Sequence, residues 1–103
     1  MKETLRQISP VKLIAAAKLL KTIAHPARLE ILEVLESEEP LDVSTICKRI
    51  EHPCEISMMS HHLSKLKDNG ILHSEKQGKH IFYRLADRRM LSIFDCMDKC
   101  NII

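Results

Sequence analysis

Two short helical segments that lie close together in the chain constrain the fold most. The first is predicted to start at Ser44 and the second at Ser57, because a serine hydroxyl can cap the first turn of a helix. The second helix is predicted to run to the stop signal Asn69-Gly70. Residues 44–70 therefore predict a helix-turn-helix, in which the first helix holds the second in place to be presented to DNA.

The flanking segments predict the rest of the fold. Ser9-Pro10 favours a helix over residues 9–24, and His25-Pro26 ends it and begins another. Residues 71–85 read as two strands around Gly78, and Asp87 is a predicted cap for a last helix over 87–100. This order predicts a mainly α fold with a small β-hairpin, a winged helix-turn-helix whose terminal helices form a dimer interface.

Length and composition favour one domain that shares its core with a second copy. The chain has 103 residues without a Gly-, Pro- or Ser-rich break, so we expect a single domain over 1–103. Aromatic residues make up 3% of it, so aliphatic side chains must supply the core. We assign residues 9–24 and 87–100 to dimerisation, 44–70 to the helix-turn-helix and 71–85 to the wing.

Other function classes find little support in the sequence. No apolar run of about 18 residues and no signal-peptide block is present, which predicts a cytoplasmic protein without membrane contact. Its four cysteines are then expected as free thiols. No nucleophile clusters with an acid or base, so we expect no enzyme. A net charge of +2 is too small to identify a nucleic-acid binder by itself.

Four blocks, in the right order, resemble the ArsR/SmtB family of winged helix-turn-helix repressors. Residues 23–32 resemble the signature "LADPTRLRIL", and residues 57–72 resemble "STVSRHLKLLREAGLV". Residues 41–46 resemble the start of the family's third helix, and residues 78–85 its wing. The resemblance implies a homodimeric transcriptional repressor that binds double-stranded operator DNA and releases it when an inducer arrives.

The second helix of the helix-turn-helix carries the main candidates for DNA contact. Helical periodicity places Met59, Leu63 and Leu66 inward and leaves short polar side chains outward. The residues alone favour a solvated helix face, whereas the family resemblance favours DNA. His62 lies at the edge of the inward face, so a structural hydrogen bond explains it equally well. The predicted contacts are Ser57, Met58, Ser60, His61, His62, Ser64 and Lys65.

The hairpin supplies a second group of candidates around Gly78. The cations Lys76, Lys79, His80 and Arg84 could meet phosphates beside the minor groove. An edge hairpin kept soluble by its lysines is an alternative, and both can hold. A symmetric dimer predicts an operator with inverted half-sites about one helical turn, or a multiple of it, apart.

The resemblance also indicates where a metal site would lie. Metal sensors of the family often carry a Cys-x-Cys pair at the start of the third helix, where this chain has Asp42 and Ser44. A second family site, on the last helix, begins with an Asp matched by Asp87, but Arg89 and Cys100 stand where its histidines belong. We therefore predict no metal and no cofactor.

Two alternative functions remain open. Cys96 and Cys100 are four residues apart, so a dimer could gather their thiols into a sensor of oxidants or soft metals, or the cysteines simply pack. Cys47 is expected to be buried, and Cys54, in a loop, could approach a thiol that the sequence does not identify. A winged-helix protein-interaction module is the other alternative, and it should expose apolar or acidic residues where Ser57 and its outward neighbours stand.

Overall fold

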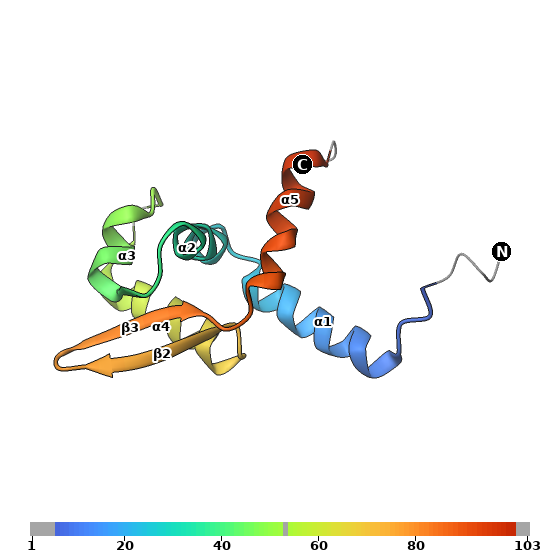
Figure 1. Cartoon of the computed structure of the whole chain (residues 1–103), viewed down its shortest axis with the longest axis horizontal. Helices are drawn as coiled ribbons and strands as arrows, with labels where there is room; N and C mark the ends of the chain where they lie inside the picture. Colours follow the sequence, from blue (N-terminus) through green and yellow to red (C-terminus); the bar gives the residue numbers. More distant parts are fainter. Residues whose placement is uncertain (1–5, 53, 101–103) are drawn as a thin grey trace.

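A computed structural model describes residues 6–52 and 54–100, so the ends of the predicted 1–103 domain lie outside the described residues. The fold is mainly helical with one small sheet, as predicted (Figure 1). Its elements in chain order are α1 (Pro10–Ile23), α2 (Pro26–Ser37), β1 (Leu41–Asp42), α3 (Val43–Arg49), α4 (Ile56–Asp68), β2 (Leu72–Gln77), β3 (His80–Leu85), the 3₁₀ helix η2 (Arg88–Leu91) and α5 (Ser92–Lys99).

An aliphatic core joins α2, α3, α4 and the sheet. Ile31, Leu35, Ile46 and Leu72 are fully buried members of one cluster, and Tyr83 is its buried aromatic residue. The predicted inward face of α4 is confirmed, because Met59, Leu63 and Leu66 are all buried. Burying such side chains contributes about 1.5–3 kcal/mol each. The core therefore holds the second helix of the helix-turn-helix firmly against the body.

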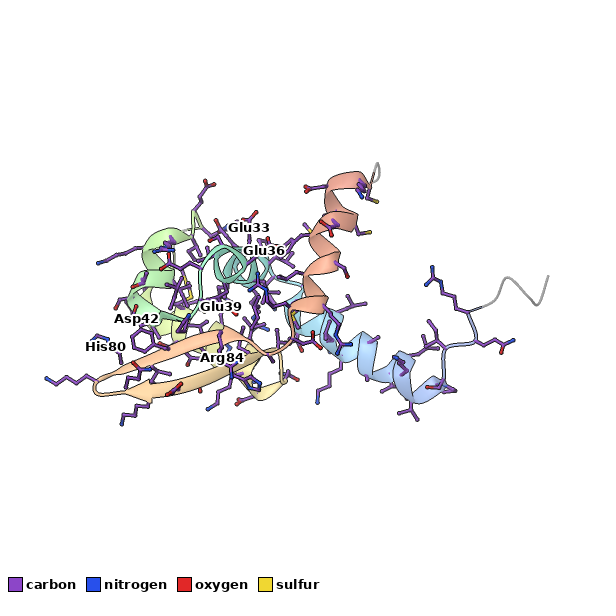
Figure 2. The ribbon with its side chains drawn as sticks, in the orientation of Figure 1. Glu33, Glu36, Glu39, Asp42, His80 and Arg84 are labelled. Carbon is purple, nitrogen blue, oxygen red and sulfur yellow. The ribbon has the colours of Figure 1, made fainter. Side chains whose placement is uncertain are left out.

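The sheet contains a strand that the sequence did not predict. Its order is β1-β3-β2 and all pairs are antiparallel, with Leu41 of β1 opposite Tyr83 of β3. The hairpin of β2 and β3 was predicted, and Gly78 turns it with a positive φ of 63°. Glu39 accepts the backbone N–H of Leu85 at 3.0 Å, which fastens the base of the wing to the α2–β1 connection (Figure 2).

Three of the predicted caps need correction. The helix α3 begins at Val43, and Asp42 caps it by accepting the N–H of Thr45 at 3.1 Å, so Ser44 lies inside the first turn. The helix α4 begins at Ile56 after Glu55, so Ser57 is no cap either. Asp87 caps the 3₁₀ helix η2, which precedes α5. The helices α3 and α4 therefore begin earlier than the serine pattern suggested, whereas α5 begins later, at Ser92.

The terminal helices project from the body and leave apolar surface uncovered (Figure 1). In α1 only Thr22 and Ile23 are buried, and α5 has no buried residue. The large apolar side chains exposed in and beside α1 are Ile8, Val11, Leu13, Ile14, Leu19 and Leu20. Several large apolar side chains exposed together on a projecting helix are typical of an interface. None of the helices in the described ranges is long and apolar enough to cross a membrane.

The corrected cap of α3 gives a first prediction. Replacing Asp42 with Ala should lower the free energy of unfolding by about 1 kcal/mol, because the N–H of Thr45 loses its acceptor. Hydrogen bonds from Thr45 hold the pKa of Asp42 below 3.8. The stabilisation is therefore complete above pH 3.8 and is lost as the pH falls through the folded-state pKa. Urea unfolding at several pH values measures both effects.

The matched control is Ser44→Ala, in the first turn of the same helix. Ser44 is exposed and makes no capping bond, so this change should alter stability by less than about 0.5 kcal/mol. An equal loss in the two variants would contradict the assignment of the cap to Asp42.

Candidate nucleic-acid interface

The exposed face of α4 gathers the predicted DNA contacts. Ser57, Met58, His61, Ser64 and Lys65 are all exposed. Their positions follow from the burial of Met59, Leu63 and Leu66, which fixes the rotation of the helix about its own axis. Ser60 is half-buried beside this face. The face offers hydroxyls, an imidazole and an ammonium group, all of which can bind phosphates or base edges.

Two exposed apolar side chains lie in the first turn of α4, and the sequence predicted Met58 among the DNA contacts but not Ile56. Ile56 is 53% exposed and Met58 is 51% exposed, so two large apolar side chains project from the first turn. The serine pattern makes Ser57 the cap and so places Ile56 before the helix, whereas Ile56 is the first residue of α4. In a major groove such side chains can contact the methyl group of thymine. The first turn therefore combines apolar and hydroxyl groups.

A buried arginine fastens α4 to the junction of α1 and α2. Arg28 is 7% exposed, and its Nη1–H donates to the carbonyl of Thr22 at 2.8 Å. Its Nε–H donates to Nδ1 of His62 at 2.9 Å. Thr22 lies near the end of α1, Arg28 in the first turn of α2, and His62 in α4. One guanidinium thus links three helices, and His62 is a structural partner whatever else it contacts.

The link requires a neutral His62. Nδ1 can accept the bond from Arg28 only when it carries no proton. Burial lowers the pKa of His62 below 6.5, and the nearby charges of Arg28, His25 and His61 lower it further. The rings of His25 and His61 lie 5.9 Å and 6.3 Å from that of His62, measured between centroids. At neutral pH the His62 imidazole is therefore uncharged, and its Nδ1 can accept the hydrogen bond from Arg28.

The predicted wing residues do not share one face. Lys76 lies opposite Ile81 and so shares its face, whereas His80 and Arg84 alternate onto the other face. Lys79 sits in the turn, and all four are exposed. His80 is also engaged, since its Nδ1 lies 3.2 Å from a carboxylate oxygen of Asp42 (Figure 2). Of these four cations, only His80 forms an ion pair within the described residues.

The connection from α3 to α4 is fastened by a carboxylate of α2. Glu30 accepts the backbone N–H groups of Glu51 and His52 at 2.7 Å and 3.2 Å. Its carboxylate also lies 3.0 Å from Nδ1 of His52. Burial raises the pKa of Glu30, but these hydrogen bonds outweigh it and leave the pKa lowered. The turn is thereby tied to the helix that carries Arg28.

Three residues at the family's metal positions, Asp42, Asp87 and Arg89, have side-chain partners in the protein. Asp42 caps α3 and contacts His80. Arg89 forms an ion pair with Asp87 at 2.6 Å, and this pair holds the pKa of Asp87 at about 2. Among residues 6–52 and 54–100, no group of three or more His, Cys, Asp or Glu side chains is arranged to hold a metal ion.

The predicted thiol pair lies at the end of α5. Cys96 is exposed in the helix, and Cys100 is half-buried as its C-cap with an extended backbone. Both are free thiols. A sensing role for them stays a prediction.

Comparison with known proteins identifies the family. A family model described as "Helix-turn-helix domain" matches residues 23–75. The transcriptional repressor PagR of Bacillus anthracis is 33% identical over 82 residues, which cover 80% of this chain and 80% of PagR. The repressor SmtB of Mycobacterium tuberculosis is 33% identical over 80 residues, which cover 77% of this chain and 56% of SmtB. This chain belongs to the ArsR/SmtB family.

Solved structures agree with the ArsR/SmtB assignment and with the fold. The crystal structure of PagR superposes with a TM-score of 0.73 at 30% identity, covering 86% of this chain and 99% of PagR. The solution structure of Mb0332 from Mycobacterium bovis, a homodimeric winged helix-turn-helix DNA-binding domain, has a TM-score of 0.70. It covers 91% of this chain and 87% of Mb0332 at 23% identity, and so supports the fold alone. As an ArsR/SmtB member, the protein is a DNA-binding transcriptional regulator, as predicted.

The hydrogen bond to His62 gives a second prediction. Replacing His62 with Leu leaves the Nε–H of buried Arg28 without an acceptor, which should lower the free energy of unfolding by about 1–3 kcal/mol. His62→Asn is the matched control, because its Oδ1 can accept in place of Nδ1, and it should cost less. Urea unfolding at pH 7 measures the difference.

The pH dependence of the same variants checks the charge state. Because the folded-state pKa of His62 is lowered, its contribution to stability is complete above pH 6.5 and is lost as the pH falls through the folded-state pKa. The His62→Asn variant has no imidazole at this position and should lose less stability between pH 7 and pH 5. Parallel losses in the wild type and this variant would refute a neutral His62.

Proposed function

We propose that the protein is a homodimeric transcriptional repressor that reads an inverted-repeat operator with α4 and holds the DNA backbone with its wing. The observation that carries this is the amphipathic division of α4. One face is buried through Met59, Leu63 and Leu66, and the opposite face presents the polar contacts already described. That geometry matches a recognition helix, whose N-terminal residues meet base edges in the major groove.

The proposed contacts divide into two kinds. Residues of the first turns, Ile56, Ser57, Met58 and His61, would meet base edges and so carry sequence preference. Ser60, Ser64 and Lys65 and the wing cations Lys76, Lys79, His80 and Arg84 would meet phosphates and fix the position of the protein on DNA. Repression follows when the bound protein occupies a promoter. The relatives PagR and SmtB are named as transcriptional repressors.

Dimerisation is proposed through α1 and α5, with a receiving groove between α2 and α5. Leu29, Phe94 and Met97 line the groove with apolar surface, and Glu33 and Glu36 of α2, which are labelled in Figure 2, line it with carboxylates. The helix α1 carries its uncovered apolar face together with Lys12, Lys18 and Lys21 and no acidic residue. Both the apolar surface and the opposite charges favour docking of the partner's α1 in this groove.

The dimer proposal gives a third prediction. Ile14 is 72% exposed on α1, so Ile14→Glu should fold normally but bury an unpaired carboxylate at the interface. A penalty of about 3 kcal/mol would weaken dimerisation roughly 100-fold. Sedimentation at micromolar concentration measures it. The matched control is Ile81→Glu in the wing, where the isoleucine is 40% exposed and outside the proposed interface. A dimeric Ile14→Glu variant would refute this interface.

DNA binding itself gives the fourth prediction. The purified protein should bind DNA from upstream of its own gene in preference to random DNA, measured by fluorescence anisotropy at defined salt. Replacing both Lys79 and Arg84 with Ala should reduce the slope of log K against log salt by about two units or less, while sequence preference is kept. His61→Ala should instead relax the sequence preference by about 1–3 kcal/mol.

A control on α5 separates these effects from general loss of charge. Lys99→Ala removes a cation of α5 that lies outside α4 and the wing, and the variant, once shown to sediment as a dimer, should leave the salt slope unchanged. No preference over random DNA at any candidate operator would contradict the proposed function and would favour a protein-interaction module.

A further inference from the structure

Two cysteines meet at the turn between α3 and α4. The thiol of Cys47, in α3, donates to the carbonyl oxygen of Cys54 at 3.1 Å. The thiol of Cys54 lies 3.5 Å from the carbonyl oxygen of Glu55. Both cysteines are free and half-buried. The thiol that Cys54 approaches, which the sequence did not identify, is that of Cys47.

The position of this pair matters because it adjoins the start of α4. Cys54 directly precedes Glu55, which is the N-cap of α4 and makes no side-chain capping bond. The connection before it is held by Glu30 and by the bond from Cys47. Any movement of Cys54 is therefore passed to the first turn of α4, where Ser57 and Met58 are exposed.

We propose that Cys47 and Cys54 form a dithiol site that a peroxide oxidises to an intramolecular disulfide, and that this disulfide weakens DNA binding. The thiolate of Cys47 attacks one peroxide oxygen, the O–O bond breaks, and one water leaves after protonation. The thiol of Cys54 then attacks the sulfenic sulfur of Cys47, loses its proton and expels a second water. Two thiols lose two protons and two electrons, and one hydrogen peroxide becomes two waters.

The reduced pair is a resting state that supports the turn. Burial raises the pKa of the Cys54 thiol above its usual value, and the neighbouring Cys47 and Glu55 raise it further. Cys54 thus stays protonated at neutral pH, while the Cys47 thiol donates its hydrogen bond to the carbonyl of Cys54. The thiols then act as donors that hold residue 54 in place.

The disulfide is incompatible with that arrangement. Oxidation removes both sulfur-bound hydrogens, so Cys47 can no longer donate to the carbonyl of Cys54. In the disulfide the Cys54 sulfur bonds to the Cys47 sulfur, which in the reduced protein lies 3.1 Å from the carbonyl oxygen of Cys54, and a disulfide holds its two Cα atoms about 4.4–6.8 Å apart. The backbone at residue 54 therefore changes, and the exposed first turn of α4 is displaced from the position that suits base edges.

The test uses the dimer with hydrogen peroxide as the probe. The Cys96→Ser/Cys100→Ser variant keeps only the proposed pair. After treatment, peptide mass mapping should show a link between residues 47 and 54 with the loss of two hydrogens, in a chain that runs as a monomer on a non-reducing gel. The dissociation constant for operator DNA should rise about tenfold or more, and a reducing thiol should restore it.

The matched control adds Cys47→Ser to the same variant. Its hydroxyl can still donate to the carbonyl of Cys54, so the turn is kept while the disulfide is impossible. This protein should bind DNA equally well before and after peroxide. An equal loss of affinity in the control would overturn the proposal. So would a link that maps to other cysteines, or a link between 47 and 54 that leaves DNA binding unchanged.

The proposed effect of the disulfide on DNA binding rests on the proposed function. Measuring DNA binding by the reduced protein distinguishes a failure of one from a failure of the other. Absence of specific binding by the reduced dimer would refute the proposed function, and the control of DNA binding with it. Mass mapping would still decide whether the pair reacts. Specific binding before peroxide that persists after the 47–54 link forms would refute the inference alone.

Discussion

The arrangement of α1, α2 and α4 depends on the hydrogen bonds of the buried Arg28 guanidinium. It bonds to the carbonyl of Thr22 near the end of α1 and to the imidazole of His62 in α4. A cation in this position is tolerated because its Nε and Nη1 both donate to protein acceptors, and no buried side-chain nitrogen or oxygen among the described residues lacks a partner. The same contact connects the helix proposed for dimerisation with the helix proposed for DNA. A change at the dimer interface that moves the end of α1 would therefore reach α4 directly.

The fold was largely predictable because its local patterns agree with its packing. Gly70 has a positive φ of 76° after α4, as the Asn-Gly stop signal indicated, and the buried stripe of α4 follows its apolar spacing. The caps were less predictable. A serine before an apolar run is a weak guide when an aspartate two residues earlier is already oriented by pairing of β1 with β3, as Asp42 is opposite Phe82.

The functional residues were predictable only in part, because several act through tertiary contacts. Arg28 lies on the buried face of α2 with Ile31, Leu32 and Leu35. A charged residue at such a position indicates a buried hydrogen-bond partner. The identity of that partner, 34 residues away, has no local pattern. The exposure of Ile56 was hidden by the misplaced start of α4. The contact between Cys47 and Cys54 likewise depends on the path of the turn.

The turn between α3 and α4 is held by two kinds of hydrogen bond, and only one kind is sensitive to oxidation. Glu30 accepts two backbone N–H groups as a carboxylate, and its lowered pKa keeps it charged through the neutral range. Cys47 donates through a thiol, which oxidation removes. The hydrogen bonds to Glu30 therefore persist under oxidising conditions, whereas the hydrogen bond from Cys47 is lost when the thiol is oxidised. An oxidant would alter only the end of the turn next to α4, while Glu30 keeps the preceding residues in place, so the change stays local to the DNA-facing helix.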